Sequence, residues 1–94
     1  MRPYRNLKMA SVIREELNLI FLKDFDFNGA LVTIGDVDVD EKLDEAKVFF
    51  SVLPFEKGPE TYKMIEDRRR ELQYKLVRKM NVKPIPRLKF EITQ

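Results

Sequence analysis

The chain has 94 residues, of which 44% are hydrophobic and 11% aromatic, so it is long enough for one domain with an apolar core and too apolar for a disordered segment. It contains no cysteine and no histidine, which excludes disulfides and thiol nucleophiles and removes the commonest general base. No apolar run approaches the roughly 20 residues that a membrane span requires. We therefore expect a cytoplasmic protein that is not an enzyme, binds no membrane and needs no cofactor.

The net charge of +2 conceals an uneven distribution along the chain. Residues 1–23 have a net charge of +3, residues 24–45 of −7 and residues 46–94 of +6. A basic half beside an acidic belt fits a polyanionic partner that approaches from one side. Ordinary solvated charge gives the same pattern, so the distribution alone does not identify the partner.

The first predicted element is an amphipathic helix over about residues 6–22. Its apolar side chains recur at helical spacing, namely at Met9, Val12, Ile13, Leu17, Ile20 and Phe21. The Asn28-Gly29 pair that follows is typical of a turn.

Two strands are predicted next, over residues 31–40 and 46–53. Both are rich in β-branched or aromatic residues, but in the first the apolar phase differs on the two sides of Gly35. A bulge or bend at that glycine would reconcile the two halves. Because only a short polar turn joins the strands, we expect an antiparallel hairpin.

A second helical region is predicted from Gly58-Pro59 to about Met80, after Pro54 ends the second strand. An apolar stripe runs along it through Ile65, Leu72, Leu76 and Met80. The stripe has a gap, because a continuous helix would place Arg68 or Arg69 on it. We therefore predict an interruption at these arginines.

The same gap predicts how the three consecutive arginines are oriented. Arg68 or Arg69 should lie at the edge of the core, with its aliphatic stem buried and its charged head in solvent. Arg70 should point outward.

The last predicted element is a third strand over residues 87–92, where apolar and polar side chains alternate. Asn81 is expected to terminate the preceding helix, and residues 83–86 should form an extended linker because of their prolines. The element order is helix, strand, strand, interrupted helix, strand. It predicts a single α+β domain over residues 1–94, with a three-stranded sheet and helices packed on one face.

The carboxylates between residues 36 and 45 invite a metal-site or acid–base interpretation. An EF-hand loop starting at Asp36 would need glycine and a carboxylate at the positions of Glu41 and Lys47. The alternating valines favour a strand, so we interpret the acids as the solvent-facing side of the hairpin. We predict no metal site and no catalytic residue, and the three isolated glycines form no phosphate-binding loop.

Basic side chains are concentrated around the interrupted helix, since residues 62–89 contain ten basic and three acidic residues. An RNA backbone requires such a surface, and arginines can fork onto phosphate oxygens. The alternative is a solvated helix face that is partly paired with Asp67 and Glu71. The predicted phosphate contacts are Arg68, Arg69, Arg70, Lys75, Arg78, Lys79 and Lys83, with Arg2, Arg5 and Lys8 as a second basic element.

Four stretches together resemble the ribosome-binding factor A family of bacterial small-subunit assembly factors. They are residues 12–17, 32–39, 43–53 and 85–90, which follow one another in the order found in the family. The resemblance implies a KH-like fold of the second (type II) topology. It also implies binding to the 16S rRNA of the immature 30S subunit and a role in maturation and rRNA processing that is felt most strongly in the cold.

One segment departs from the family pattern. The family usually has a small-residue kink, Ala-x-Gly, between its last two helices, and here Arg68, Arg69 and Arg70 occupy that position. The function we expect is that of a monomer that binds rRNA on the free 30S subunit and acts by stabilising a conformation. The alternative is a protein–protein interaction module whose acidic hairpin binds a basic partner and whose RNA binding is incidental.

Overall fold

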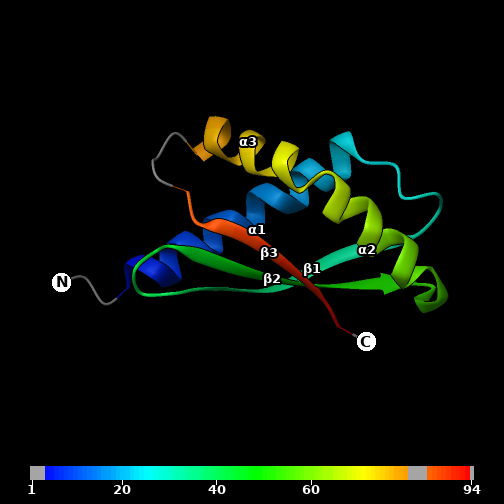
Figure 1. The fold of residues 1–94 in the computed structure, drawn as a ribbon, viewed down its shortest axis with the longest axis horizontal. Helices are drawn as coiled ribbons and strands as arrows, with labels where there is room; N and C mark the ends of the chain where they lie inside the picture. The colour runs from blue at the N-terminus through cyan, green and yellow to red at the C-terminus, as the bar shows by residue number, and fades with distance from the viewer. Residues whose placement is uncertain (1–3, 81–84, 94) are drawn as a thin grey trace.

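The computed structural model describes residues 4–80 and 85–93, which form a helical layer on a three-stranded sheet (Figure 1). In chain order the elements are α1 (Arg5–Asp24), β1 (Leu31–Val39), β2 (Glu45–Leu53), the short 3-10 turn η1 (Phe55–Lys57), α2 (Gly58–Asp67), α3 (Arg69–Met80) and β3 (Arg87–Ile92). The predicted order is confirmed, whereas η1 was not anticipated. Within the described residues, no helix combines the length and the apolar character needed to cross a bilayer.

β1 and β2 form the predicted antiparallel hairpin, in which Leu31 lies opposite Leu53. Their register shifts between Ile34 and Val37. The bulge predicted around Gly35 is therefore confirmed. It lets the buried side chains on both sides of the glycine reach the same face of the sheet.

β3 lies on the other side of β2 and runs parallel to it, with Glu45 paired to Arg87 and Phe50 to Ile92. The parallel direction follows from the long connection, because the chain crosses the helical layer through α2 and α3 before it returns to the sheet. As a result, β1 and β3 are the two edge strands.

The three helices cover one face of the sheet, as predicted (Figure 1). On β2, every second residue from Ala46 to Val52 is buried beneath them, while the residues between are only partly covered. The fully buried side chains that hold the two layers together are Ile13, Leu17, Val48, Phe50, Ile65, Leu72, Leu76, Leu88 and Phe90. Burial of this apolar surface is the main stabilising contribution to the fold.

The helical region is interrupted at Arg68, which confirms the break predicted from the gap in the apolar stripe. The Arg68 amide donates to the Ile65 carbonyl at 3.1 Å, and the Arg68 carbonyl accepts from the Leu72 amide at 3.0 Å. Both backbone groups of Arg68 are therefore hydrogen-bonded at the break, and α2 and α3 meet at an angle (Figure 1). The predicted helix end at Asn81 and the first part of the predicted linker, residues 83–84, lie outside the described residues.

Candidate RNA-binding surface

The joint between α2 and α3 is held by a network of charged side chains. The Arg68 guanidinium carbon lies 3.7 Å from the centre of the Phe25 ring. Its Nε and Nη2 donate to the two carboxylate oxygens of Glu71, at 3.0 and 2.6 Å. Lys75 Nζ lies 2.9 Å from a carboxylate oxygen of Asp24 and 3.2 Å from one of Glu71. We call Asp24, Phe25, Arg68, Glu71 and Lys75 the joint network.

The charges of the joint network satisfy one another. Hydrogen bonds from Arg68, and secondly from Lys75, lower the pKa of Glu71 to about 2. The hydrogen bond from Lys75 likewise lowers the pKa of Asp24, and the same bonds raise the pKa values of both cations. Arg68 is one of the two arginines expected at the edge of the core with the head in solvent, and its side chain keeps 34% of its accessible surface, but the head also has partners. Its head is stacked on a ring and paired, because α1 ends directly opposite.

A second group of α3 side chains faces away from the core, in which Leu72 and Leu76 are buried. Arg70, Tyr74 and Arg78 are four residues apart, so they lie in one row on the helix. All three are exposed, and Tyr74 retains 60% of its accessible surface. Arg78 Nη1 donates to the Tyr74 hydroxyl at 3.1 Å, and its guanidinium lies 5.8 Å from the ring centre. We call these three residues the open stripe.

The cations of the open stripe differ from Arg68 and Lys75 in their partners. Among residues 4–80 and 85–93, no carboxylate forms a salt bridge with Arg70 or Arg78. The outward direction predicted for Arg70 is thus confirmed. Lys79, one turn beyond Lys75, is also exposed.

Arg69 belongs neither to the joint network nor to the open stripe. It lines a groove between α2 and the outer edge of β3. The groove has a volume of about 520 Å³ and is lined by Glu45, Tyr62, Glu66, Arg69, Arg87, Leu88, Lys89, Phe90 and Glu91. Arg69 Nε lies 3.6 Å from a carboxylate oxygen of Glu66. The Tyr62 ring stacks almost parallel on Phe50, at 10° and 6.2 Å. The groove therefore combines cations, carboxylates and two aromatic rings, those of Tyr62 and Phe90.

Sequence reasoning did not find this groove. Its two walls come from α2 and β3, and nothing in the local spacing indicates which strand edge lies beside α2. The alternation in residues 87–92 was the available signal, because it assigns Arg87 and Lys89 to one face of the strand.

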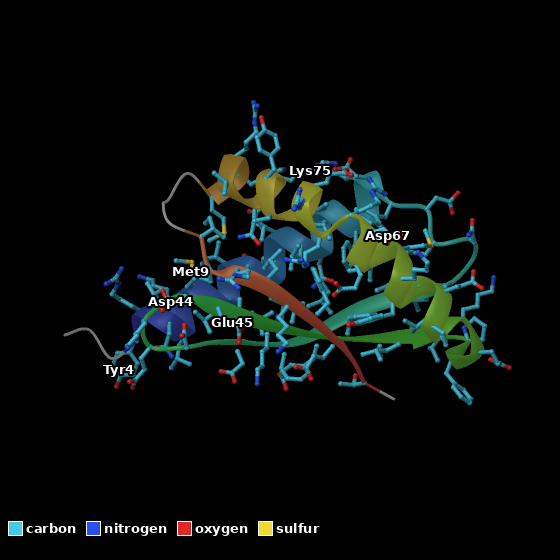
Figure 2. All side chains as sticks on the ribbon, in the orientation of Figure 1. Tyr4, Met9, Asp44, Glu45, Asp67 and Lys75 are labelled. Atoms are coloured by element: carbon cyan, nitrogen blue, oxygen red, sulfur yellow. The ribbon has the colours of Figure 1, made fainter. Side chains whose placement is uncertain are left out.

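The second predicted basic element lies apart from α3. Arg5 and Lys8 are exposed in the first turns of α1, where Asn6 Nδ2 donates to the Val39 carbonyl at 3.0 Å. Figure 2 shows Tyr4 and Asp44 at the same end of the molecule, well away from Lys75. The structure therefore places Arg5 and Lys8 beside the acidic turn. Arg2 and Lys83 lie outside the described residues.

The acidic turn between β1 and β2 has a structural role for one of its carboxylates. Asp40 Oδ1 accepts the backbone N–H groups of Asp44 and Glu45, at 2.7 and 3.2 Å. Such a side-chain cap is the usual reason for aspartate in a tight turn. Across residues 4–80 and 85–93, no three acidic side chains are grouped so that they could hold a metal ion.

Comparison with known proteins identifies the family. A family profile described as ribosome-binding factor A matches residues 5–94. The chain belongs to the ribosome-binding factor A family. The ribosome-binding factor A of Coprothermobacter proteolyticus is 28% identical over 93 residues, covering 98% of this chain and 68% of that protein. The one from Akkermansia muciniphila is 27% identical over 88 residues, covering 94% and 70%.

A solved structure confirms the fold of the family. The crystal structure of ribosome-binding factor A from Thermus thermophilus matches with a TM-score of 0.74 at 20% sequence identity, over 95% of this chain and 97% of that one. The α+β architecture with a three-stranded sheet is therefore that of ribosome-binding factor A. Membership of this family makes the chain a ribosome-binding factor.

Proposed function

We propose that this ribosome-binding factor binds the 16S rRNA of the immature 30S subunit and promotes its maturation and rRNA processing. The family match over residues 5–94 is the observation that carries this proposal. The protein acts by stabilising an rRNA conformation and performs no chemistry. Its contribution is largest during growth in the cold, when misfolded RNA helices rearrange slowly. Its place of action is the cytoplasm, and it binds as a monomer.

The open stripe supplies the main phosphate contacts. Arg70 and Arg78 are eight residues apart on α3, which separates them by about 12 Å along the helix axis. The two guanidinium groups can therefore contact different phosphates of one RNA strand. Tyr74 lies between the two arginines, with its exposed ring available to stack on a base that is splayed out of a helix.

The joint network has a different part in binding. A phosphate that bound Arg68 or Lys75 would have to displace Glu71 or Asp24 from bonds of 2.6 to 3.2 Å. These two cations therefore fix the angle at which α3 presents the open stripe. Arg69, Lys79, Arg5 and Lys8 add weaker contacts at the edges of the surface. Arg2 and Lys83 remain sequence-based predictions.

Phosphate contacts position a protein on RNA and do not by themselves read its sequence. The exposed aromatic and basic side chains of α3 fit recognition of RNA shape and of single-stranded segments. Binding through several phosphates must weaken steeply as salt rises, because each contact releases condensed counterions.

The proposal is tested by sedimenting the purified protein with three particles: immature 30S subunits, mature 30S subunits and joined ribosomes. We expect co-sedimentation with free subunits, strongest for the immature ones, and none with joined ribosomes. Raising the salt from about 50 to 200 mM should reduce binding by orders of magnitude. Equal binding to joined ribosomes, or binding that does not respond to salt, would contradict the proposal.

A cellular experiment addresses maturation separately. A strain that lacks the protein should accumulate unprocessed 16S rRNA precursor, and more of it at low temperature. Complementation with the wild-type chain should restore processing, as should the Lys42→Ala variant, which removes an exposed cation from the acidic turn. A deletion strain with normal precursor levels at every temperature would exclude a role in processing.

A further inference from the structure

An apolar patch lies at the end of the sheet where β2 leads into η1. Leu31 and Leu53 are cross-strand partners there, and Phe55 follows within three residues of β2. These three side chains retain 62%, 61% and 66% of their accessible surface. A shallow hollow lies between Leu53, Phe55, Glu56 and Pro59. We call Leu31, Leu53, Phe55 and Pro59 the end patch.

Single exposed apolar residues are common, but a contiguous group of them marks a site of interaction. The end patch is also extended, since a second hollow lined by Gly58, Pro59, Tyr62 and Ile92 adjoins it at Pro59. Gly58 packs closely on the end of β3 at this point, because a Cβ on Gly58 would lie 3.0 Å from Ile92 Cδ1.

The rim of the end patch is acidic. Glu56 lines the hollow, and Glu60 is exposed in the first turn of α2. The exposed Asp26 lies in the neighbouring loop, which is tied to η1 by a 2.6 Å hydrogen bond from Lys57 Nζ to the Asn28 carbonyl. Lys57 is the only cation among residues 53–62, and this bond directs it at the protein's own backbone.

The end patch lies away from the open stripe. In Figure 1, η1 and the start of α2 are at the right-hand end of the molecule, whereas α3 runs toward the upper left. A phosphate backbone would meet carboxylates at the end patch, so RNA is disfavoured there. A second copy of this chain is disfavoured as well, because a symmetric contact would place the two acidic rims face to face.

We propose that the end patch docks a basic segment of a protein on the 30S subunit, one rich in Lys and Arg that carries an aliphatic or aromatic anchor. The anchor fills the hollow beside Phe55, and the cations of the segment meet Glu56, Glu60 and Asp26. Proteins that bind rRNA have this chemistry, so the partner is a ribosomal protein. This inference rests on the proposed function, because the subunit supplies the partner. The factor would then hold RNA with α3 and protein with the opposite end.

The test compares two binding targets: protein-free 16S rRNA and complete 30S subunits. Phe55→Ser should weaken binding to subunits at least tenfold and leave binding to free rRNA unchanged. Leu7→Ser is the matched control. Leu7 is an apolar residue of similar exposure to Phe55, and it lies in the first turn of α1, outside the end patch. Glu56→Gln with Glu60→Gln neutralises two carboxylates of the rim without touching the apolar residues, and should also weaken binding to subunits while leaving binding to free rRNA close to that of the wild type. It keeps the test valid if Phe55→Ser unfolds the chain.

The partner is identified by replacing Phe55 with the photoreactive p-benzoylphenylalanine and irradiating the complex with 30S subunits. Mass spectrometry should find an adduct with a Lys- and Arg-rich peptide of a ribosomal protein. An adduct with rRNA or with a second copy of the chain would overturn the inference. So would unchanged subunit binding by both patch variants, and in that case the proposed function would stand as long as the wild type still binds. A wild type that binds neither target would overturn both.

Discussion

Arg68 and Arg70 are two residues apart in one run of three arginines, yet they have opposite surroundings. Arg68 stacks on Phe25 and forks onto Glu71 as part of the joint network. Arg70 begins the open stripe and has no salt-bridge partner among residues 4–80 and 85–93. The difference shows that charge density along a sequence does not measure the charge available to a ligand.

Helix geometry and the position of α1 together explain the difference. Each residue turns an α-helix by roughly 100°, so Glu71 and Lys75, which are four residues apart, share one side of α3, whereas Arg70 lies about 140° from Lys75. The C-terminal end of α1 lies against the first side and contributes Asp24 and Phe25. The side away from α1 keeps its cations for a partner.

The largest expected effect comes from removing both arginines of the open stripe. Arg70→Ala with Arg78→Ala should weaken binding to 16S rRNA roughly tenfold or more at about 0.1 M salt and make the salt slope shallower by about two units. Thermal stability should be unchanged. Filter binding over a salt series measures this, with Lys42→Ala, which removes another exposed cation, as the control. Unchanged affinity would move the RNA surface to Arg5 and Lys8.

Substitutions in the joint network should have the opposite effect, lowering the stability of the fold and leaving RNA binding unchanged. Arg68→Ala should lower the free energy of unfolding by roughly 1–2 kcal/mol, because the stack on Phe25 and the fork onto Glu71 are lost together. Arg68→Lys keeps the charge but cannot form two parallel hydrogen bonds to Glu71, so its free energy of unfolding should lie between those of the wild type and Arg68→Ala. Urea denaturation measures both variants, and the salt slope of RNA binding should be that of the wild type. A stable Arg68→Ala variant with weakened RNA binding would abolish the distinction between the two regions.

The low pKa of Glu71 predicts how the joint network depends on pH. The folded-state pKa is about 2, below the ordinary value of 4.5, so Glu71 stabilises the fold above pH 4.5. This contribution is lost as the pH falls from 4.5 toward 2. Glu71→Gln should therefore be less stable at pH 7 and show a flatter loss of stability in that window, measured by melting temperature. If the melting temperatures of the Glu71→Gln variant and the wild type fell in the same way between pH 4.5 and 2, Glu71 would not be paired with Arg68 and Lys75 in solution.

The smallest effect is expected at the acidic turn. Asp38→Asn with Asp40→Asn should leave both the melting temperature and RNA affinity close to wild type, within about 0.5 kcal/mol for stability. Asn keeps the oxygen that accepts the Asp44 and Glu45 amides. Asp44 in this turn also lies well away from Lys75 of α3 (Figure 2). A clear loss of 30S binding would instead favour the alternative in which the acidic hairpin contacts a basic partner.

Much of the architecture could be predicted because it depends on local spacing. The hairpin followed from two adjacent β-rich segments, the bulge from the change of apolar phase at Gly35, and the helix break from the gap at Arg68. Each of these features is decided by residues that are close together in the sequence, where the spacing determines which side chains share a face of the helix or strand.

The family was likewise identifiable from the sequence, because it depends on the order of several stretches along the chain. Only the tertiary structure decided which strand pairs with β3 and where the groove and the end patch lie. It also decided which arginines are paired and which are exposed. Lys75 bonds to Asp24 across 51 residues, and β2 pairs with β3 across the whole helical layer. Contacts between such distant segments depend on how the helical layer packs on the sheet around one core. The spacing of neighbouring residues determines which side chains share a face, but it does not determine that packing.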